Sequence, residues 1–127
     1  MNDARIADNA GEQPIDTPVI PGGPAAYFTS LPIKAMLSAL LAEGINAEVS
    51  QTAGTFVCNH VFYGLMHELS TRADLRHTRG GLIHIPWLPV QGQPSMQLDE
   101  VVQGLKLAIQ CARATVTDIH KEAGSLN

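Results

Sequence analysis

Cys58 is the residue whose type and position are best suited to chemistry. It follows a small, polar run at 50–55 and falls at the start of a segment with helical periodicity. The first backbone N–H groups of a helix have no intrahelical acceptor and the dipole there is positive, so a thiol tends to ionise to the nucleophilic thiolate. The same N–H groups can hold an oxyanion, and Gly54 suits a tight turn. Because cysteine is also a common buried residue, simple packing is the alternative interpretation.

His84 is the candidate partner of Cys58. It lies in the apolar segment 80–86 (GGLIHIP), between Ile83 and Ile85, which point to the opposite face of a strand. Pro86 indicates the carboxyl end of that strand, where functional groups gather in parallel sheets. We therefore expect His84 and the turn before Cys58 at one edge of a sheet. A buried structural histidine is the alternative.

The remaining histidines and cysteine give weaker patterns. Cys58, His60, His67 and His84 could be assembled into a zinc site, but positions two apart on a helix point about 200° apart. No metal site is therefore predicted. Cys111 falls near the apolar stripe of the last helix and is expected to be structural.

Composition excludes several classes of function. The chain has 127 residues, a formal net charge of −4 and 45% hydrophobic residues, so it is too apolar for a disordered chain and lacks a basic nucleic-acid footprint. Asp74 interrupts the arginines at 72, 76 and 79. The longest apolar run, at 35–42, is far shorter than the roughly 20 residues of a membrane span. Two cysteines without a secretory signal favour a cytoplasmic protein, and nothing indicates a cofactor.

Three helices and two strands are predicted to position these residues. Helices are expected at 32–43, with Ser30 as cap and Gly44 at its end, at 57–70, and from a Ser95 cap to before residue 118. Strands are expected at 45–50 and 80–86, the second one buried. Residues 1–25 are predicted to be extended loop, and residues 118–127 a fraying tail. The alternation of helices and strands predicts an α/β fold with a parallel sheet.

Each predicted helix carries an apolar stripe that we expect to face a core. The residues of these stripes are Ile33, Met36, Leu37, Leu40 and Leu41 in the first helix; Val61, Phe62, Leu65, Met66 and Leu69 in the second; and Leu98, Val101, Val102, Leu105, Ile109, Ala112 and Val116 in the third.

Residues 50–65 (SQTAGTFVCNHVFYGL) form a long signature around Cys58. This signature resembles the active-site segment of the pyrrolidone-carboxylate peptidases, the type I pyroglutamyl peptidases, and residues 80–86 resemble the segment that carries their catalytic histidine. Further matches are 2–6 (NDARI), 13–16 (QPID) and 23–28 (GPAAYF). The resemblance covers nearly the whole chain up to about Cys111.

The resemblance implies a cysteine exopeptidase that removes N-terminal pyroglutamate (5-oxoproline) from peptides without a cofactor. By position, Cys58 matches the nucleophile and His84 the general base. Phe56 and Val57 match residues beside the pocket for the lactam ring, and Arg5 matches an arginine near the cysteine. The implied fold is a three-layer α/β/α sandwich around a mostly parallel sheet, and the implied assembly is a homotetramer.

The chain also departs from the family. The resemblance implies a glutamate that orients the histidine and several amino-terminal strands, all upstream of the matching residues. Glu48 and Glu68 are available acids, but nothing in the sequence places either beside His84. We therefore interpret residues 1–127 as a single, incomplete domain, the carboxyl-terminal part of the family's fold. Either it belongs to a longer active peptidase, or it is a catalytically inactive remnant or a subunit that depends on a partner.

Overall fold

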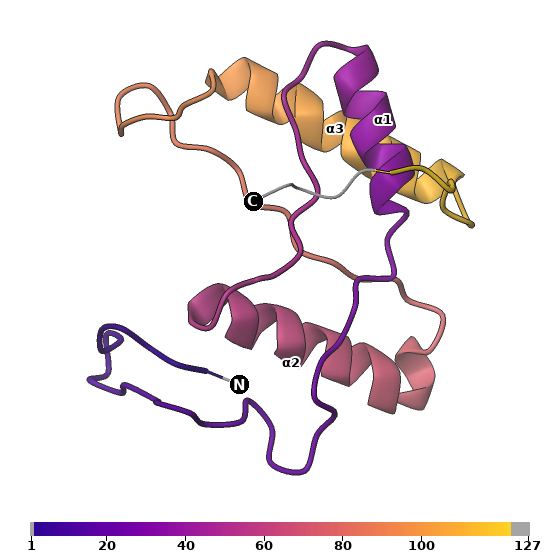
Figure 1. Cartoon of the computed structure of the whole chain (residues 1–127). Coiled ribbons are helices and arrows are strands. Elements are labelled where there is room, and N and C mark those ends of the chain that lie inside the picture. Colours follow the sequence, from indigo (N-terminus) through magenta and orange to yellow (C-terminus); the bar gives the residue numbers. More distant parts are fainter. Residues whose placement is uncertain (1, 123–127) are drawn as a thin grey trace. The chain divides into compact units, whose positions relative to one another are not determined.

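The computed structural model describes residues 2–122, which divide into two compact units. The first unit contains the described residues up to 30 together with 52–82, and the second contains 31–51 and 83–122. The interpretation of the chain as a single incomplete domain stays a prediction. The elements in chain order are α1 (Ile33–Ala42), α2 (Val57–Thr71), the short 3-10 helix η1 (Ala73–Leu75) and α3 (Leu98–Ala114), as Figure 1 shows.

Helix α1 ends as its sequence predicts. Gly44 adopts a φ of 74°, the left-handed conformation that glycine enters without a steric cost. The N–H of Gly44 donates to the carbonyl of Leu41, and the N–H of Ile45 donates to that of Leu40. These two bonds form a Schellman motif, which satisfies carbonyls left open at the helix end. The prediction of Gly44 as the terminating residue is confirmed.

The start of α1 differs from the prediction. Pro32 occupies the N-cap position and makes no side-chain cap. The N–H groups of Lys34 and Ala35 donate instead to the carboxylate of Asp118, at 3.0 and 2.9 Å. The prediction of a Ser30 cap is therefore wrong, because a residue distant in sequence supplies the acceptor. Residues 123–127, the end of the predicted tail, lie outside the described residues.

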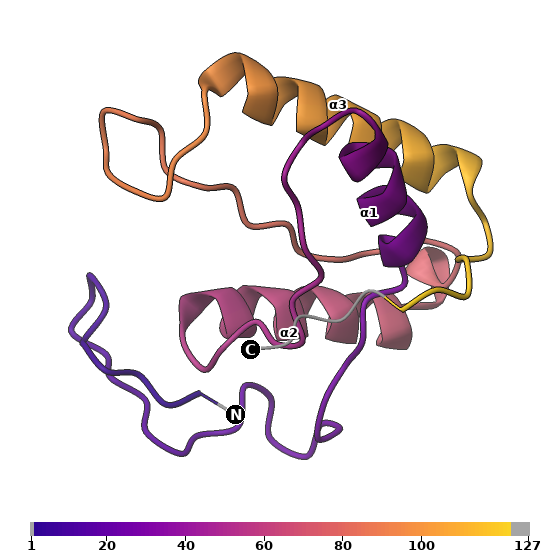
Figure 2. The ribbon, with the colours of Figure 1, turned by 45° about the horizontal axis from the view of Figure 1, so that its top comes forward.

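The core of the second unit forms where α1 packs against α3, a contact that both Figure 1 and Figure 2 show. Gly104 of α3 lies against Leu40 and Ile45, because its missing side chain leaves room for a close approach. The buried residues of this core, apart from Pro32, are Met36, Ile45, Val101, Gly104 and Ala108.

Helix α3 begins later than predicted. Its N-cap is Gln97, not Ser95, and Asp99 and Glu100 lie in the first turn as expected. Ser95 forms an isolated parallel bridge with Trp87, next to a hydrogen bond from the N–H of Met96 to the Trp87 carbonyl. The Ser95 cap is therefore a wrong prediction, since this bridge holds the residue in extended backbone ahead of the helix.

The first unit is organised around α2. The hydroxyl of Tyr63 donates to the carbonyl of Pro24 at 2.6 Å, and the ring of Tyr27 lies edge-on to that of Tyr63 with 4.9 Å between centroids. The Tyr27 hydroxyl also bonds Nδ1 of His67 at 2.9 Å. Burial, and to a smaller extent the neighbouring Tyr27, raise the pKa of Tyr63. Through these contacts, residues 24–27 pack against α2.

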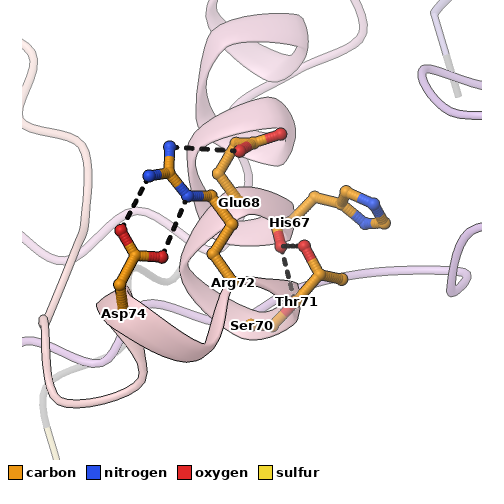
Figure 3. Close-up of polar contacts among 6 residues, drawn as sticks. All are labelled: His67, Glu68, Ser70, Thr71, Arg72 and Asp74. Carbon is orange, nitrogen blue, oxygen red and sulfur yellow. Dashed lines mark hydrogen bonds and ion pairs between the residues drawn. The ribbon is translucent and has the colours of Figure 1, made fainter.

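Polar side chains close the carboxyl end of α2 (Figure 3). The carbonyl of His67 accepts hydrogen bonds from the hydroxyls of Ser70 and Thr71. The Arg72 guanidinium donates twice to the Asp74 carboxylate, which lowers the pKa of Asp74 and raises that of Arg72. This exposed pair lies at the step from α2 to η1.

The two predicted strands are not continuous strands in the structure. Among residues 2–122, the pairings described between residues are isolated bridges, such as that of Asn2 with Thr17. Residues 82–85 are exposed, with Ile83 46% and Ile85 58% accessible, so the prediction of a buried strand is wrong for this chain. An extended segment becomes a strand only where a neighbour supplies ladder hydrogen bonds, and these residues give neither segment such a ladder.

The helical stripes are likewise only partly covered. Met36, Met66 and Val101 are buried as predicted. Other members of the predicted stripes are exposed, namely Leu41, Val61, Leu65, Leu98, Val102, Ile109 and Val116. In the part of the chain that the structure describes, no helix is long and apolar enough to cross a membrane.

Candidate active site

Cys58 is the second residue of α2 and is half-buried. The N–H of His60 donates to the carbonyl of Phe56, the N-cap residue of α2, at 3.0 Å. The N–H groups of Val57 and Cys58 therefore precede the helical ladder, and α2 has no side-chain cap. The thiol stands beside the positive end of the helix dipole, as the sequence predicts.

The turn before Cys58 depends on Gly54. Its φ is 76°, and its N–H donates to the hydroxyl of Thr52 at 2.9 Å. A Cβ atom at this position would meet no other atom within 4 Å, so the requirement for glycine is conformational rather than steric. The tight turn delivers the chain into the first turn of α2.

Asn2 and Asp3 form hydrogen bonds with residues that precede and follow Cys58 in the sequence. The N–H of Asp3 donates to the carbonyl of Thr55 at 2.8 Å, and the Thr55 hydroxyl donates to the Asp3 carbonyl at 3.2 Å. On the helix side, the amide Nδ2 of Asn59 donates to Oδ1 of Asn2 at 2.9 Å. Nδ2 of Asn2 bonds Nδ1 of His60 at 2.8 Å.

The hydrogen bond with Asn2 determines the tautomer of the His60 ring. An amide nitrogen only donates, so Nδ1 of His60 is the acceptor and the ring proton is on Nε2. This use of Nδ1 makes His60 a structural partner of Asn2 rather than a base for Cys58. Among residues 2–122, no three His, Cys, Asp or Glu side chains gather in a way that could hold a metal ion.

The predicted site residues fall in both units. Arg5, Phe56, Val57 and Cys58 belong to the first unit, and His84 belongs to the second. Arg5 is exposed, Val57 is 51% accessible and Phe56 is half-buried. His84 is exposed on residues 82–85. Phe56, Val57 and Cys58 thus lie together at the start of α2, and the roles predicted for the five residues stay predictions.

Cys111 has surroundings of a different kind. It lies near the end of α3, half-buried, with its Sγ 3.8 Å from the hydroxyl of Thr115. The N–H groups of this last turn already belong to the helical ladder, and the negative end of the dipole is close. Cys111 therefore lies at the opposite end of a helix dipole from Cys58, which makes it a useful reference.

Asn2 and Asn59 were not predicted from the sequence as residues of the site. Asn2 is 6% exposed and bonds a residue 58 positions away, so no local periodicity or spacing indicates it. The sequence gives at most a weak signal for this role of Asn2. If an asparagine is buried, both the oxygen and the nitrogen of its side-chain amide need hydrogen-bond partners.

Solved structures place the chain in a class of α/β proteins. Pyroglutamyl peptidase I from Bacillus amyloliquefaciens superposes with a TM-score of 0.90 at 49% identity, over 96% of this chain and 59% of that one. A variant of the pyrrolidone carboxyl peptidase of Pyrococcus furiosus gives a TM-score of 0.81 at 36% identity, over 91% and 59%. The chain is therefore part of an α/β fold, as the sequence predicts.

Sequence comparison then gives the family. The profile of the family described as pyroglutamyl peptidase matches residues 1–115. The pyrrolidone-carboxylate peptidase of Cupriavidus necator is 57% identical over 100% of this chain and 61% of its own length. Pyrrolidone-carboxylate peptidase 1 of Ralstonia nicotianae is 58% identical over 100% and 60%. The chain belongs to the pyroglutamyl peptidase family, and it spans about 60% of the length of these relatives.

Proposed function

We propose that this chain is the nucleophile-bearing part of a cysteine exopeptidase that removes N-terminal pyroglutamate from peptides. The observation that carries the proposal is the position of Cys58 at the start of α2, within residues that match the family. In this proposal Cys58 is the nucleophile, and His84 is the general base and later the general acid.

The reaction divides into two acyl transfers. The Cys58 sulfur attacks the carbonyl carbon that follows the lactam ring, after its proton has passed to His84. The tetrahedral oxyanion then lies near the N–H groups at the start of α2, whose dipoles are already aligned. The C–N bond breaks, and the leaving amine takes the proton from His84. A thioester with Cys58 remains.

Water completes the cycle. His84 takes a proton from a water molecule as that water attacks the thioester carbonyl, and the protonated imidazole then returns the proton to the Cys58 sulfur. The products are free pyroglutamate and a peptide shortened by one residue. A thiol and an imidazole suffice for these steps, so the proposal includes no cofactor or metal.

Phe56, Val57 and Arg5 are proposed to bind the substrate. Phe56 and Val57 directly precede Cys58 and present apolar surface, which suits the face of a lactam ring. Arg5 follows the segment that bonds Thr55, and its exposed guanidinium can serve a carboxylate or an oxyanion. Peptides with N-terminal pyroglutamate are the proposed partners, together with further copies of the chain in a homotetramer. The cytoplasm is the proposed location.

The exposed segment that carries His84 favours a second candidate, in which the 127 residues alone are inactive or depend on a partner. His84 is exposed, and the flanking Ile83 and Ile85 are about half accessible, so within residues 2–122 the imidazole is not enclosed by packing. A histidine without an orienting acid loses orders of magnitude in rate. We expect little or no peptidase activity from the isolated chain.

A fluorogenic pyroglutamyl amide tests the proposal. The substrate is offered to the chain alone and to a chimera in which the chain follows the residues of the Cupriavidus relative that precede the match. We expect activity from the chimera, loss of that activity in Cys58→Ser and His84→Ala, and retention in Cys111→Ser as the matched control. An active chimera that tolerates Cys58→Ser would contradict the assignment of the nucleophile. Strong activity of the isolated chain would contradict the second candidate.

A further inference from the structure

The side chain of Asn2 lies almost fully out of solvent, at 6% exposure, in the first unit. Its backbone N–H donates to the Thr17 carbonyl at 2.7 Å, and its own carbonyl accepts from the Thr17 N–H at 3.1 Å. A buried amide is costly unless it finds hydrogen-bond partners, and both groups of this side chain have found them on α2.

Those partners are two consecutive residues in the first turn of α2. Oδ1 of Asn2 accepts from Asn59 and Nδ2 donates to His60, so one side chain ties the residues that directly follow Cys58. The next residue, Asp3, exchanges two hydrogen bonds with Thr55, three positions before Cys58. Residues 2–3 therefore form hydrogen bonds with residues on both sides of Cys58 in the sequence.

We propose that Asn2 is a positioning residue for Cys58, acting through Asn59 and His60. Its side-chain hydrogen bonds go to Asn59 and His60 and not to the thiol. It fixes the first turn of α2, and so holds in place the N–H groups of Val57 and Cys58, which precede the helical ladder. A first turn that frays would move these dipoles away, and the thiolate would lose their stabilisation. The inference rests on the proposed role of Cys58 as the nucleophile.

The test compares the two cysteines of the intact chain. Iodoacetamide alkylation of Cys58 and Cys111 is followed by mass spectrometry over a range of pH, in the wild type, Asn2→Ala and His60→Ala. Asn9→Ala is the matched control, because Asn9 is an exposed asparagine of the same loop region. Hydrogen exchange of the amides at 55–61 is measured on the same samples, and circular dichroism checks that each variant is folded.

For Asn2→Ala we expect the pH profile of Cys58 to move to higher pH, with alkylation at neutral pH slower by about threefold or more. The profile of Cys111 should stay in place, and exchange at 55–61 should become faster. His60→Ala should shift the Cys58 profile in the same direction by less, and Asn9→Ala should shift nothing. Parallel changes at both cysteines would indicate a merely structural role and overturn the proposal.

A folded Asn2→Ala variant with the wild-type Cys58 profile and wild-type exchange would also overturn it. If Asn2→Ala does not fold, His60→Ala decides by the same two measurements, since its exposed side chain can be removed without opening a core. Failure of the proposed function gives a different result. In that case wild-type Cys58 reacts no faster than Cys111, while exchange at 55–61 still depends on Asn2, which supports the positioning of the turn.

Discussion

The carboxylate of Asp118 accepts a 2.9 Å hydrogen bond from the backbone N–H of Ala35, 83 residues earlier in the chain. Its other oxygen accepts from the N–H of Lys34, so two of the open donors of α1 are satisfied by one side chain. The first turn of α1 has no acidic residue of its own. Asp118 therefore acts as an N-cap supplied from beyond α3, and it ties the segment after that helix to the start of α1.

Asp118→Ala should lower the free energy of unfolding by about 1 kcal/mol, the usual cost of losing an N-cap side chain. The loss arises because the N–H groups of Lys34 and Ala35 then have only water as an acceptor. Urea denaturation followed by circular dichroism measures the change. Thr117→Ala is the control, since Thr117 is exposed and adjacent. Equal denaturation midpoints for the two variants would show that the cap contributes nothing.

The contribution of Asp118 should also depend on pH. Partial burial raises the pKa of this carboxyl, but the N–H groups of Lys34, Ala35 and Ile119 lower it more, so the net pKa lies below the ordinary value of 3.8. A carboxyl with a lowered pKa in the folded state stabilises the fold above its unfolded pKa, and that stabilisation is lost as pH falls through the folded pKa.

We therefore expect the stability difference between wild type and Asp118→Ala to be constant from about pH 7 to about pH 5 and to shrink below about pH 4. Urea midpoints collected at each pH give this difference directly. Thr117→Ala should follow the wild type throughout. A difference that persists unchanged in acid would mean that the ionised carboxylate is not what caps α1.

The helices could be predicted from the sequence because their signals are local. The apolar spacing and Gly44 locate α1 to within a residue, and the polar turn before Cys58 locates the start of α2. The N-caps of α1 and α3 and the strands could not be predicted in this way. The acceptor at the start of α1 comes from Asp118, and a strand at 80–86 needs neighbours that periodicity does not reveal.

The same division applies to the candidate site. Cys58 is recognisable because its position in a helix is a local property, and its place at the start of α2 is confirmed. Asn2 is not recognisable, because its role depends on Asn59 and His60, which come close to it only in the folded chain. The roles of His84 and Arg5 stay predictions.

Ser30 should matter to stability through Gly80 rather than through α1. Its hydroxyl accepts from the N–H of Gly80 at 2.9 Å, and its own N–H donates to the Gly80 carbonyl at 3.0 Å. Gly80 is buried, so Ser30→Ala leaves an N–H group without its acceptor and away from water. We expect a loss of about 1–3 kcal/mol in the free energy of unfolding.

Ser30→Thr is the matched variant for this prediction, because it keeps a hydroxyl at the same position. It should retain most of the stability that Ser30→Ala loses. Urea denaturation measures both variants, and hydrogen exchange at Gly80 reports the bond itself. If the amide of Gly80 exchanges equally slowly in Ser30→Ala, another group shields it and the predicted cost does not apply.

Gly104 offers a stabilising substitution at the contact of α1 with α3. A Cβ atom there would lie 3.5 Å from Cγ2 of Ile45 and 3.6 Å from Cδ2 of Leu40, which are ordinary van der Waals distances. Glycine in a helix interior is about 1 kcal/mol less favourable than alanine. Gly104→Ala should therefore raise the free energy of unfolding by about 1 kcal/mol, as measured by urea denaturation.

Two further substitutions separate helix propensity from packing. Gly64 lies in α2, where a Cβ atom would meet nothing within 4 Å, so Gly64→Ala should give a gain from propensity alone. Gly104→Leu should reverse the gain and cost about 1–3 kcal/mol, because a longer side chain cannot fit against Ile45 without displacing it. If Gly104→Leu were as stable as Gly104→Ala, α1 and α3 would not be closely packed at this point in solution.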